Sequence, residues 1–245
     1  MVGEDMRTTT KVFVHFMIAA GAAAAVLAGC GGGSETPPDG SGFDAGPPMT
    51  TSGPYQPLTV GSTWTYKVDD QGFKYDKTST VESVEDMGGA KAGTMGYRVS
   101  ENVKASKQLT WYEQSGTEVR RHHDQFFDDQ NRMLSDEWYA PFMLRVDEAP
   151  AHMQQGATWS LDFVNTKTTS SKPTAMLNHT ETWVVDGVDV VVGVPAGSFQ
   201  ALQVTRTDVG DGAVKTMWFV KGVGKVKELT NAGHLEELSS YNIAP

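Results

Sequence analysis

Hydrophobic and polar residues follow three different patterns along the chain. An almost unbroken apolar run extends from Val12 to Leu27, and a stretch of Gly, Pro, Ser, Thr and acidic residues follows from Gly31 to Pro54. After Pro54 the chain consists of short segments in which apolar and polar residues alternate. Alternation at every second position is typical of strands with one buried face. The pattern predicts an apolar N-terminal segment, a linker that cannot bury a core, and a mainly β domain over residues 55–245.

The alternation is clearest where large apolar residues recur. Trp64, Tyr66 and Val68 share one face of a predicted strand over residues 63–68, and residues 158–163 repeat the arrangement around Trp159 and Phe163. The opposite faces carry Thr, Ser, Lys and Asp. Each predicted strand therefore has one face turned to a core and one turned to water.

Turn residues between the apolar runs predict hairpins. Asp186-Gly187 lies between two Val-rich runs within residues 182–192, which is the signal for a two-residue turn. Further hairpins are predicted over residues 202–219, closing near Gly210, and over residues 225–241, closing near Gly233. No segment after the apolar run keeps helical periodicity for three turns, and the best short helical candidate is Asp124 to Leu134.

Two halves of the domain resemble each other. The opening Gly61-Ser-Thr-Trp64 matches Gly156-Ala-Thr-Trp159, and Trp111 and Trp218 follow at similar distances. We therefore predict two meander repeats, at about 57–150 and 151–245, with about eleven antiparallel strands in total. So many strands accumulate twist until the sheet curls, which predicts a curved sheet or a half or closed β-barrel. The alternative is that unrelated strands reuse the same opening residues.

The N-terminal run has the layout of a secretory signal, with Arg7 and Lys11 before it and small residues after it. Leu27-Ala28-Gly29-Cys30 resembles the lipobox of bacterial lipoproteins, which implies that residues 1–29 are a signal peptide and that Cys30 receives fatty acyl chains such as palmitate. Cys30 is the single cysteine, so it cannot form an internal disulfide. Residues 30–54 are then a lipidated, disordered tether. Two or three acyl chains give lasting attachment, and Gly31 implies sorting to the outer membrane of the cell envelope.

The net charge of −10 argues against a nucleic-acid partner, which would need a basic face. His122-His123-Asp124 has metal-ligand residue types, but adjacent strand residues point to opposite faces and cannot easily share an ion. Gly222-Val-Gly224-Lys225 lacks the spacing of a phosphate loop, and no Gly-x-Ser-x-Gly elbow is present. The sequence therefore predicts no catalytic residue, no metal and no cofactor, and a protein that is not an enzyme.

Large aromatic residues are the remaining candidates for ligand binding. The segment Glu137-Trp138-Tyr139-Ala-Pro-Phe142 has no counterpart in the second repeat. We therefore take Trp138, Tyr139 and Phe142 as the candidate ligand-binding residues. Trp64 and Trp159 are assigned to the core, because their strand-start positions repeat.

Three phrases carry a family resemblance: Pro57 to Tyr66, Val194 to Val204 and Trp218 to Val226. They resemble uncharacterised periplasmic lipoproteins of Gram-negative bacteria, which are similar in turn to the half-barrel carriers LolA and LolB. The resemblance implies a curved sheet around an apolar concavity and brings no catalytic residues. We expect a membrane-tethered binding module for an apolar ligand or a lipidated protein. The alternative is a structural subunit that docks an envelope protein through strand edges or the outer sheet face.

Overall fold

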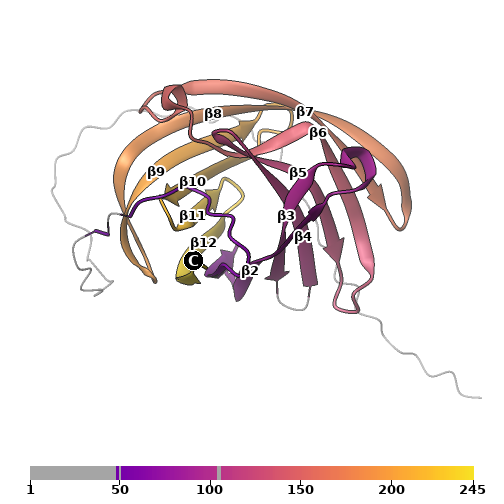
Figure 1. The fold of residues 1–245 in the computed structure, drawn as a ribbon, viewed down its shortest axis with the longest axis horizontal. Coiled ribbons are helices and arrows are strands. Elements are labelled where there is room, and N and C mark those ends of the chain that lie inside the picture. Colours follow the sequence, from indigo (N-terminus) through magenta and orange to yellow (C-terminus); the bar gives the residue numbers. More distant parts are fainter. Residues whose placement is uncertain (1–47, 50, 104–105) are drawn as a thin grey trace, which may run out of the picture. The chain divides into compact units, whose positions relative to one another are not determined.

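Twelve antiparallel strands form a closed barrel in the computed structural model, which describes residues 48–49, 51–103 and 106–245. Each strand pairs with its neighbours in sequence, and β1 also pairs with β12, which closes the ring (Figure 1). The strands are β1 Thr63–Asp70, β2 Phe73–Asp86, β3 Met95–Val103, β4 Ser106–Ser115, β5 Glu118–Phe127, β6 Met133–Asp147, β7 Thr158–Thr169, β8 Lys172–Val194, β9 Gly197–Asp208, β10 Val214–Val220, β11 Gly224–Thr230 and β12 His234–Asn242. The prediction of a mainly β barrel is confirmed, with twelve strands in place of about eleven.

Helical structure in the described residues is limited to two short 3₁₀ turns, Gly89–Lys91 and Pro150–His152. Within the same residues, no helix has the length and apolar character needed to cross a bilayer. The predicted signal peptide, Cys30 and most of the predicted tether lie outside the described part of the chain.

Two of the predicted hairpins are present. β9 and β10 are joined through Gly210 and Gly212, and β11 and β12 through Gly233. The short helix considered over Asp124 to Leu134 is absent, because these residues form the end of β5, a turn and the start of β6. Asp128 holds that turn by accepting hydrogen bonds from the backbone of Gln130 and Arg132.

The third predicted hairpin, over residues 182–192, is wrong. These residues belong to one continuous strand, β8, and both Val185 and Val190 pair with β9. The register shifts on either side of Gly187, and Asp189 adopts a positive φ of 56°. The residues that signal a turn here form a bulge, which absorbs extra residues without reversing the chain.

The two halves of the barrel use the same strands in the same order. Trp64 and Trp159 lie on β1 and β7, the first strand of each half, while Trp111 and Trp218 lie on the fourth strands, β4 and β10. The pairing to the next strand shifts by one residue directly after both Trp111 and Trp218. Gly61 N–H donates to Val81 O and Gly156 N–H donates to Val185 O, each at 2.8 Å. These correspondences agree with two meander repeats, and the duplication itself stays a prediction.

The barrel interior is apolar along one part of its length. Trp64 and Tyr66 on β1 are buried there with residues of nearly every other strand, and Tyr55 and Leu58, from the segment before β1, are buried in the same cluster. The Trp64 indole N–H donates to the backbone oxygen of Val223. Side chains therefore fill this part of the barrel.

Further along the same strands, the inner face becomes polar and charged. Val68 and Tyr66 on β1 are flanked by Lys77 on β2 and Glu236 on β12, whose charged groups are buried. Asp124 and Glu137 occupy a comparable inner position on β5 and β6. Burying a charged group in a barrel costs free energy unless an opposite charge or a hydrogen bond compensates it. A buried charge without such a partner is therefore a candidate contact for a ligand.

Candidate functional site: a basic cavity inside the barrel

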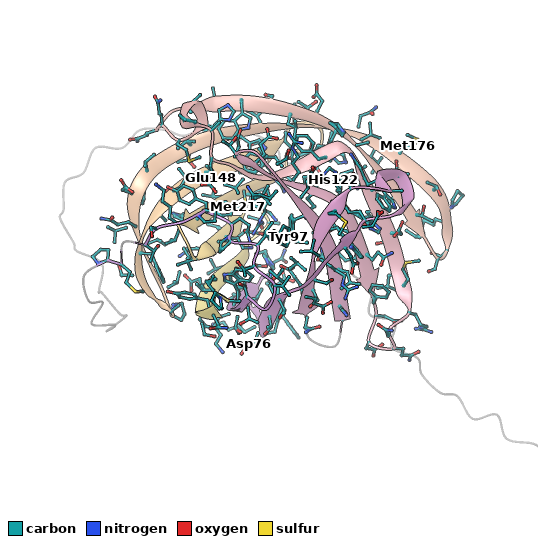
Figure 2. All side chains as sticks on the ribbon, viewed as in Figure 1. Asp76, Tyr97, His122, Glu148, Met176 and Met217 are labelled. Atoms are coloured by element: carbon teal, nitrogen blue, oxygen red, sulfur yellow. The ribbon has the colours of Figure 1, made fainter. Side chains whose placement is uncertain are left out.

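A small cavity of about 30 Å³ lies inside the barrel next to the apolar cluster. On the scale of one water molecule per 10–15 Å³ of such space, it has room for about two or three waters or one small oxyanion. Its lining combines four basic side chains with four apolar ones: Arg121, Arg145, Arg206, Lys215, Met143, Leu144, Trp183 and Met217. Figure 2 shows Met217 inside the ring of strands. None of these eight lining residues is acidic.

Four strands bring the basic side chains together. Arg121 lies on β5, Arg145 on β6, Arg206 on β9 and Lys215 on β10. Arg206 and Lys215 stand directly opposite each other in the β9–β10 pairing. Like charges at directly opposite positions destabilise a sheet unless another group compensates them. The barrel therefore concentrates positive charge around the cavity.

Water reaches these side chains although they lie deep inside the barrel. The side chain of Arg121 keeps 23% of its surface accessible, that of Arg206 keeps 20% and that of Lys215 keeps 30%. The cavity is therefore hydrated and has polar surface that is free to contact a small ligand.

Three of the four cations have a carboxylate partner. Arg121 Nε donates to Asp124 Oδ1 at 2.8 Å, Lys215 Nζ lies 2.7 Å from Glu228 Oε1, and Arg206 Nη1 lies 3.1 Å from Glu181 Oε1. Each of these carboxylates is itself buried. These pairs fix the cationic side chains in position around the cavity.

Arg145 is the exception. Its guanidinium makes a 3.5 Å contact with Gln56 Oε1 and lies 5.3 Å from the centre of the Phe219 ring, and no carboxylate lies within ion-pair distance of it among the described residues. A buried guanidinium without a partnering anion carries a large desolvation cost. Burial lowers the pKa of Arg145, but Tyr112, Glu228 and Glu101 outweigh burial and raise it, so what this position lacks is a direct anionic partner.

Burial shifts the pKa values of two neighbouring groups toward their neutral forms. Burial lowers the pKa of the Lys215 ammonium, and the adjacent Glu228 does not restore it. Burial raises the pKa of the Glu181 carboxyl in spite of Arg206 beside it. The Trp183 indole N–H and Glu181 Oε2 lie close together inside the barrel, but neither makes a hydrogen bond of good geometry. One donor and one acceptor are therefore left without a partner near the cavity.

A second charged cluster nearby is fully paired. Glu236 accepts hydrogen bonds from Lys77 and Lys225 at 2.6–2.7 Å, and Lys225 also donates to Glu228 at 2.6 Å. Glu228, His234 and Glu236 could in principle surround a metal ion. Their carboxylate oxygens are occupied by ammonium groups, which a divalent cation would have to displace. We therefore read this cluster as structural.

The sequence-predicted ligand residues do not meet in one site. Trp138 lies on the outer face, stacked 3.8 Å from His123, which stacks in turn 4.5 Å from Trp111. Tyr139 points inward and donates to Asp124 Oδ2 at 2.7 Å. Phe142 lies beneath the Arg120 guanidinium, 4.5 Å away. Trp138, Tyr139 and Phe142 are thus placed on both sides of the sheet, and none of them lines the basic cavity.

The adjacent histidines are also separated by the sheet geometry. His123 Nε2 lies 2.7 Å from Asp136, whereas His122 Nε2 lies 2.8 Å from Glu113. Burial lowers the pKa of His122 even though Glu113 opposes the shift. The two rings have different partners, so they do not form a shared site.

Sequence reasoning missed all four basic cavity residues, because they are far apart in the chain. A weak signal was available in the strand pattern: Arg206 has the same parity as the buried Leu202 and Val204, and Lys215 has the same parity as Met217 and Phe219. A cation at a core position of a predicted strand indicates a charged interior. Comparison with protein-family models, curated proteins and solved structures finds no match to this chain.

Proposed function

We propose that this protein is a membrane-tethered, non-enzymatic binding module whose barrel interior binds a ligand through a small oxyanion, such as a carboxylate or phosphate group. The observation that carries the proposal is the Arg145 guanidinium, which faces a hydrated cavity without a carboxylate partner. An oxyanion there accepts charge-assisted hydrogen bonds from Arg145 and from its cationic neighbours. It also reduces the repulsion between the like charges of Arg206 and Lys215, which stand directly opposite each other.

The cavity favours an acidic group over an acyl chain. Its volume of about 30 Å³ is far below the several hundred Å³ that a drug-sized or acyl ligand requires. The adjacent apolar region is filled by core side chains, among them Trp64, Phe219 and Leu238. A ligand with an apolar tail can place only its acidic head in this cavity unless the core opens.

The binding test compares Arg145→Gln with the wild-type chain. Phosphate, sulfate and acetate are titrated while the thermal midpoint and the heat of binding are measured. We expect an anion to raise the wild-type midpoint, and we expect Arg145→Gln to weaken binding about tenfold or more, because a charged hydrogen bond contributes about 1.5–3 kcal/mol. The matched control is Lys67→Gln, which removes an outer-face cation paired with Asp76.

The unliganded stability of Arg145→Gln separates a binding role from a structural one. Removal of a half-buried charge that has no ion-pair partner should leave the stability nearly unchanged. An anion affinity equal to that of the wild type, or the failure of all three anions to raise the midpoint, would contradict the proposal. Binding of a fluorescent fatty acid without binding of acetate or phosphate would favour the apolar ligand instead.

The tether is proposed from the N-terminal residues alone. We infer that Cys30 is acylated after removal of residues 1–29 and holds the domain at the cell envelope, with the outer membrane as the expected destination. Cys30→Ala should abolish incorporation of labelled palmitate and move the protein from the membrane fraction to the aqueous phase on detergent partition. A Cys30→Ala chain that still incorporates the label would overturn the inference.

A second candidate function is the docking of a partner through a strand edge. The observation that favours it is the first part of β8, which has a pairing partner on one side only. This edge is independent of the basic cavity, so the two functions can be tested separately.

A further inference from the structure

β8 is longer than the strand that follows it. Its residues 172–185 pair with β7, whereas its pairing with β9 begins at Glu181. Residues 172–180 therefore have no strand beside them on the β9 side within the described chain. The same segment carries two exposed apolar side chains, Met176 at 71% and Leu177 at 49%. Figure 2 places Met176 at the periphery of the molecule, well away from Met217 in the interior.

The backbone groups that face this open side can be identified. Val209 N–H donates to Thr180 O at 2.8 Å, so the backbone polar groups of Thr180 point toward the β9 side. Successive residues of a strand alternate in this respect, and the N–H and C=O of one residue point the same way. Asn178 and Met176 therefore direct their N–H and C=O groups to the open side. The regular alternation ends at Ala175, because the register of β8 against β7 shifts between Ala175 and Lys172.

We propose that a second copy of this chain pairs with this edge, antiparallel and centred on Met176. In that register Met176 faces Met176 of the second copy, and Thr174 and Asn178 face each other on the same side of the sheet. Ala175 faces Leu177 on the opposite side. Apolar residues thus meet apolar residues and polar residues meet polar ones, which is what a two-fold symmetric interface requires.

The charges of the segment permit this pairing. Lys172 is the only Lys or Arg within residues 172–180, which contain no acidic residue, and it comes to lie opposite Thr180 of the second copy. No like charges are directly opposed. Met176 and its counterpart in the second copy form a hydrogen-bonded pair, which exchanges two backbone hydrogen bonds. An exposed strand edge without charged residues at its centre is a template for such pairing.

Disulfide trapping tests the register directly. The background is the full chain with Cys30→Ser, purified in mild detergent. In this background Met176→Cys introduces the only cysteine, which lies on the two-fold axis within disulfide distance of the same residue in the second copy. We expect mild oxidation to convert most of this variant to a dimer on non-reducing gels. The matched control is Val191→Cys, which lies on the same strand with 60% exposure but is paired with β9. Equal cross-linking of the two variants would overturn the proposal.

Asn178→Pro provides a second test that does not depend on oxidation. Proline at this position removes an N–H that faces the open side and spares the pairing with β7. We expect sedimentation to show a concentration-dependent dimer for the parent chain and at least a tenfold weaker one for Asn178→Pro, with anion binding retained. A parent chain that stays monomeric at all concentrations would overturn the proposal and leave the binding function untouched.

Discussion

At the residue scale, the barrel interior depends on how each buried charge is compensated. Glu236 lies among Lys77, Lys225 and His234, and it has a hydrogen bond from each of the two lysines. Burial alone would raise the pKa of the Glu236 carboxyl, but the ammonium groups of Lys225 and Lys77 outweigh burial and hold that pKa well below its usual range. The charged form is therefore part of the folded structure.

We predict that Glu236→Gln lowers the free energy of unfolding by about 3–5 kcal/mol at pH 7, because it leaves buried ammonium groups without their counter-charge. The neighbouring Glu237→Gln, which affects a partly exposed pair with Lys227, should cost about 0–1 kcal/mol. Urea unfolding of both variants measures the difference. Similar losses in the two variants would show that the buried cluster contributes no more than a surface pair.

The same substitution changes the pH dependence of stability. A carboxyl whose pKa is lower in the folded state stabilises the protein above its unfolded pKa of about 4.3, and this contribution is lost as the pH falls toward the folded pKa. Wild-type stability should therefore fall below about pH 5, and that of Glu236→Gln should fall less steeply. Urea unfolding from pH 7 to pH 3 measures both slopes, and parallel slopes would contradict the assignment.

At the element scale, corresponding turns in the two halves have different surroundings. Gly116 follows β4 and Gly222 follows β10, with positive φ values of 60° and 68°. The space around Gly116 is open, whereas a Cβ on Gly222 would meet the backbone oxygen of Ser52. The second turn therefore also forms the contact surface for the segment that covers the apolar end of the barrel.

This difference predicts unequal costs for the same substitution. Gly116→Ala should lower stability by about 1–2 kcal/mol, which is the cost of a left-handed backbone for alanine. Gly222→Ala should cost at least about 1 kcal/mol more, because the Ser52 backbone must also move. Thermal unfolding of the two variants measures this. Equal midpoints would show that the Ser52 contact contributes nothing to stability.

At the scale of the whole molecule, closure joins the two ends of the described chain. β1 and β12 pair over eight positions, although more than 160 residues separate them (Figure 1). Closure removes most strand edges, which limits unwanted pairing. It leaves several stretches that have a strand partner on one side only, among them residues 172–180 of β8, and it encloses a cavity lined by four basic side chains. Both proposed binding surfaces follow from how this barrel closes.

Local chemistry accounts for the parts of the fold that could be predicted. The alternation around Trp64 and Trp159 predicted strands, and Gly210 and Gly233 predicted turns, because side-chain period and backbone freedom are properties of a few neighbouring residues. The prediction of a hairpin at Asp186-Gly187 was wrong for the same reason, because it used only neighbouring residues. A turn and a bulge use similar residues, and the neighbouring strand, β9, decides between them.

Local sequence pattern was sufficient to predict that this domain is mainly β and that its strands have one face turned to a core. Pairing between distant strands sets the remaining features: the ring closes, Arg145 meets Arg121, Arg206 and Lys215 in one cavity, and Trp138 faces outward. Alternation states that a residue points to one face of a strand, but not which residues of other strands share that face. That information lies in the register of pairings between distant segments, which local sequence does not encode.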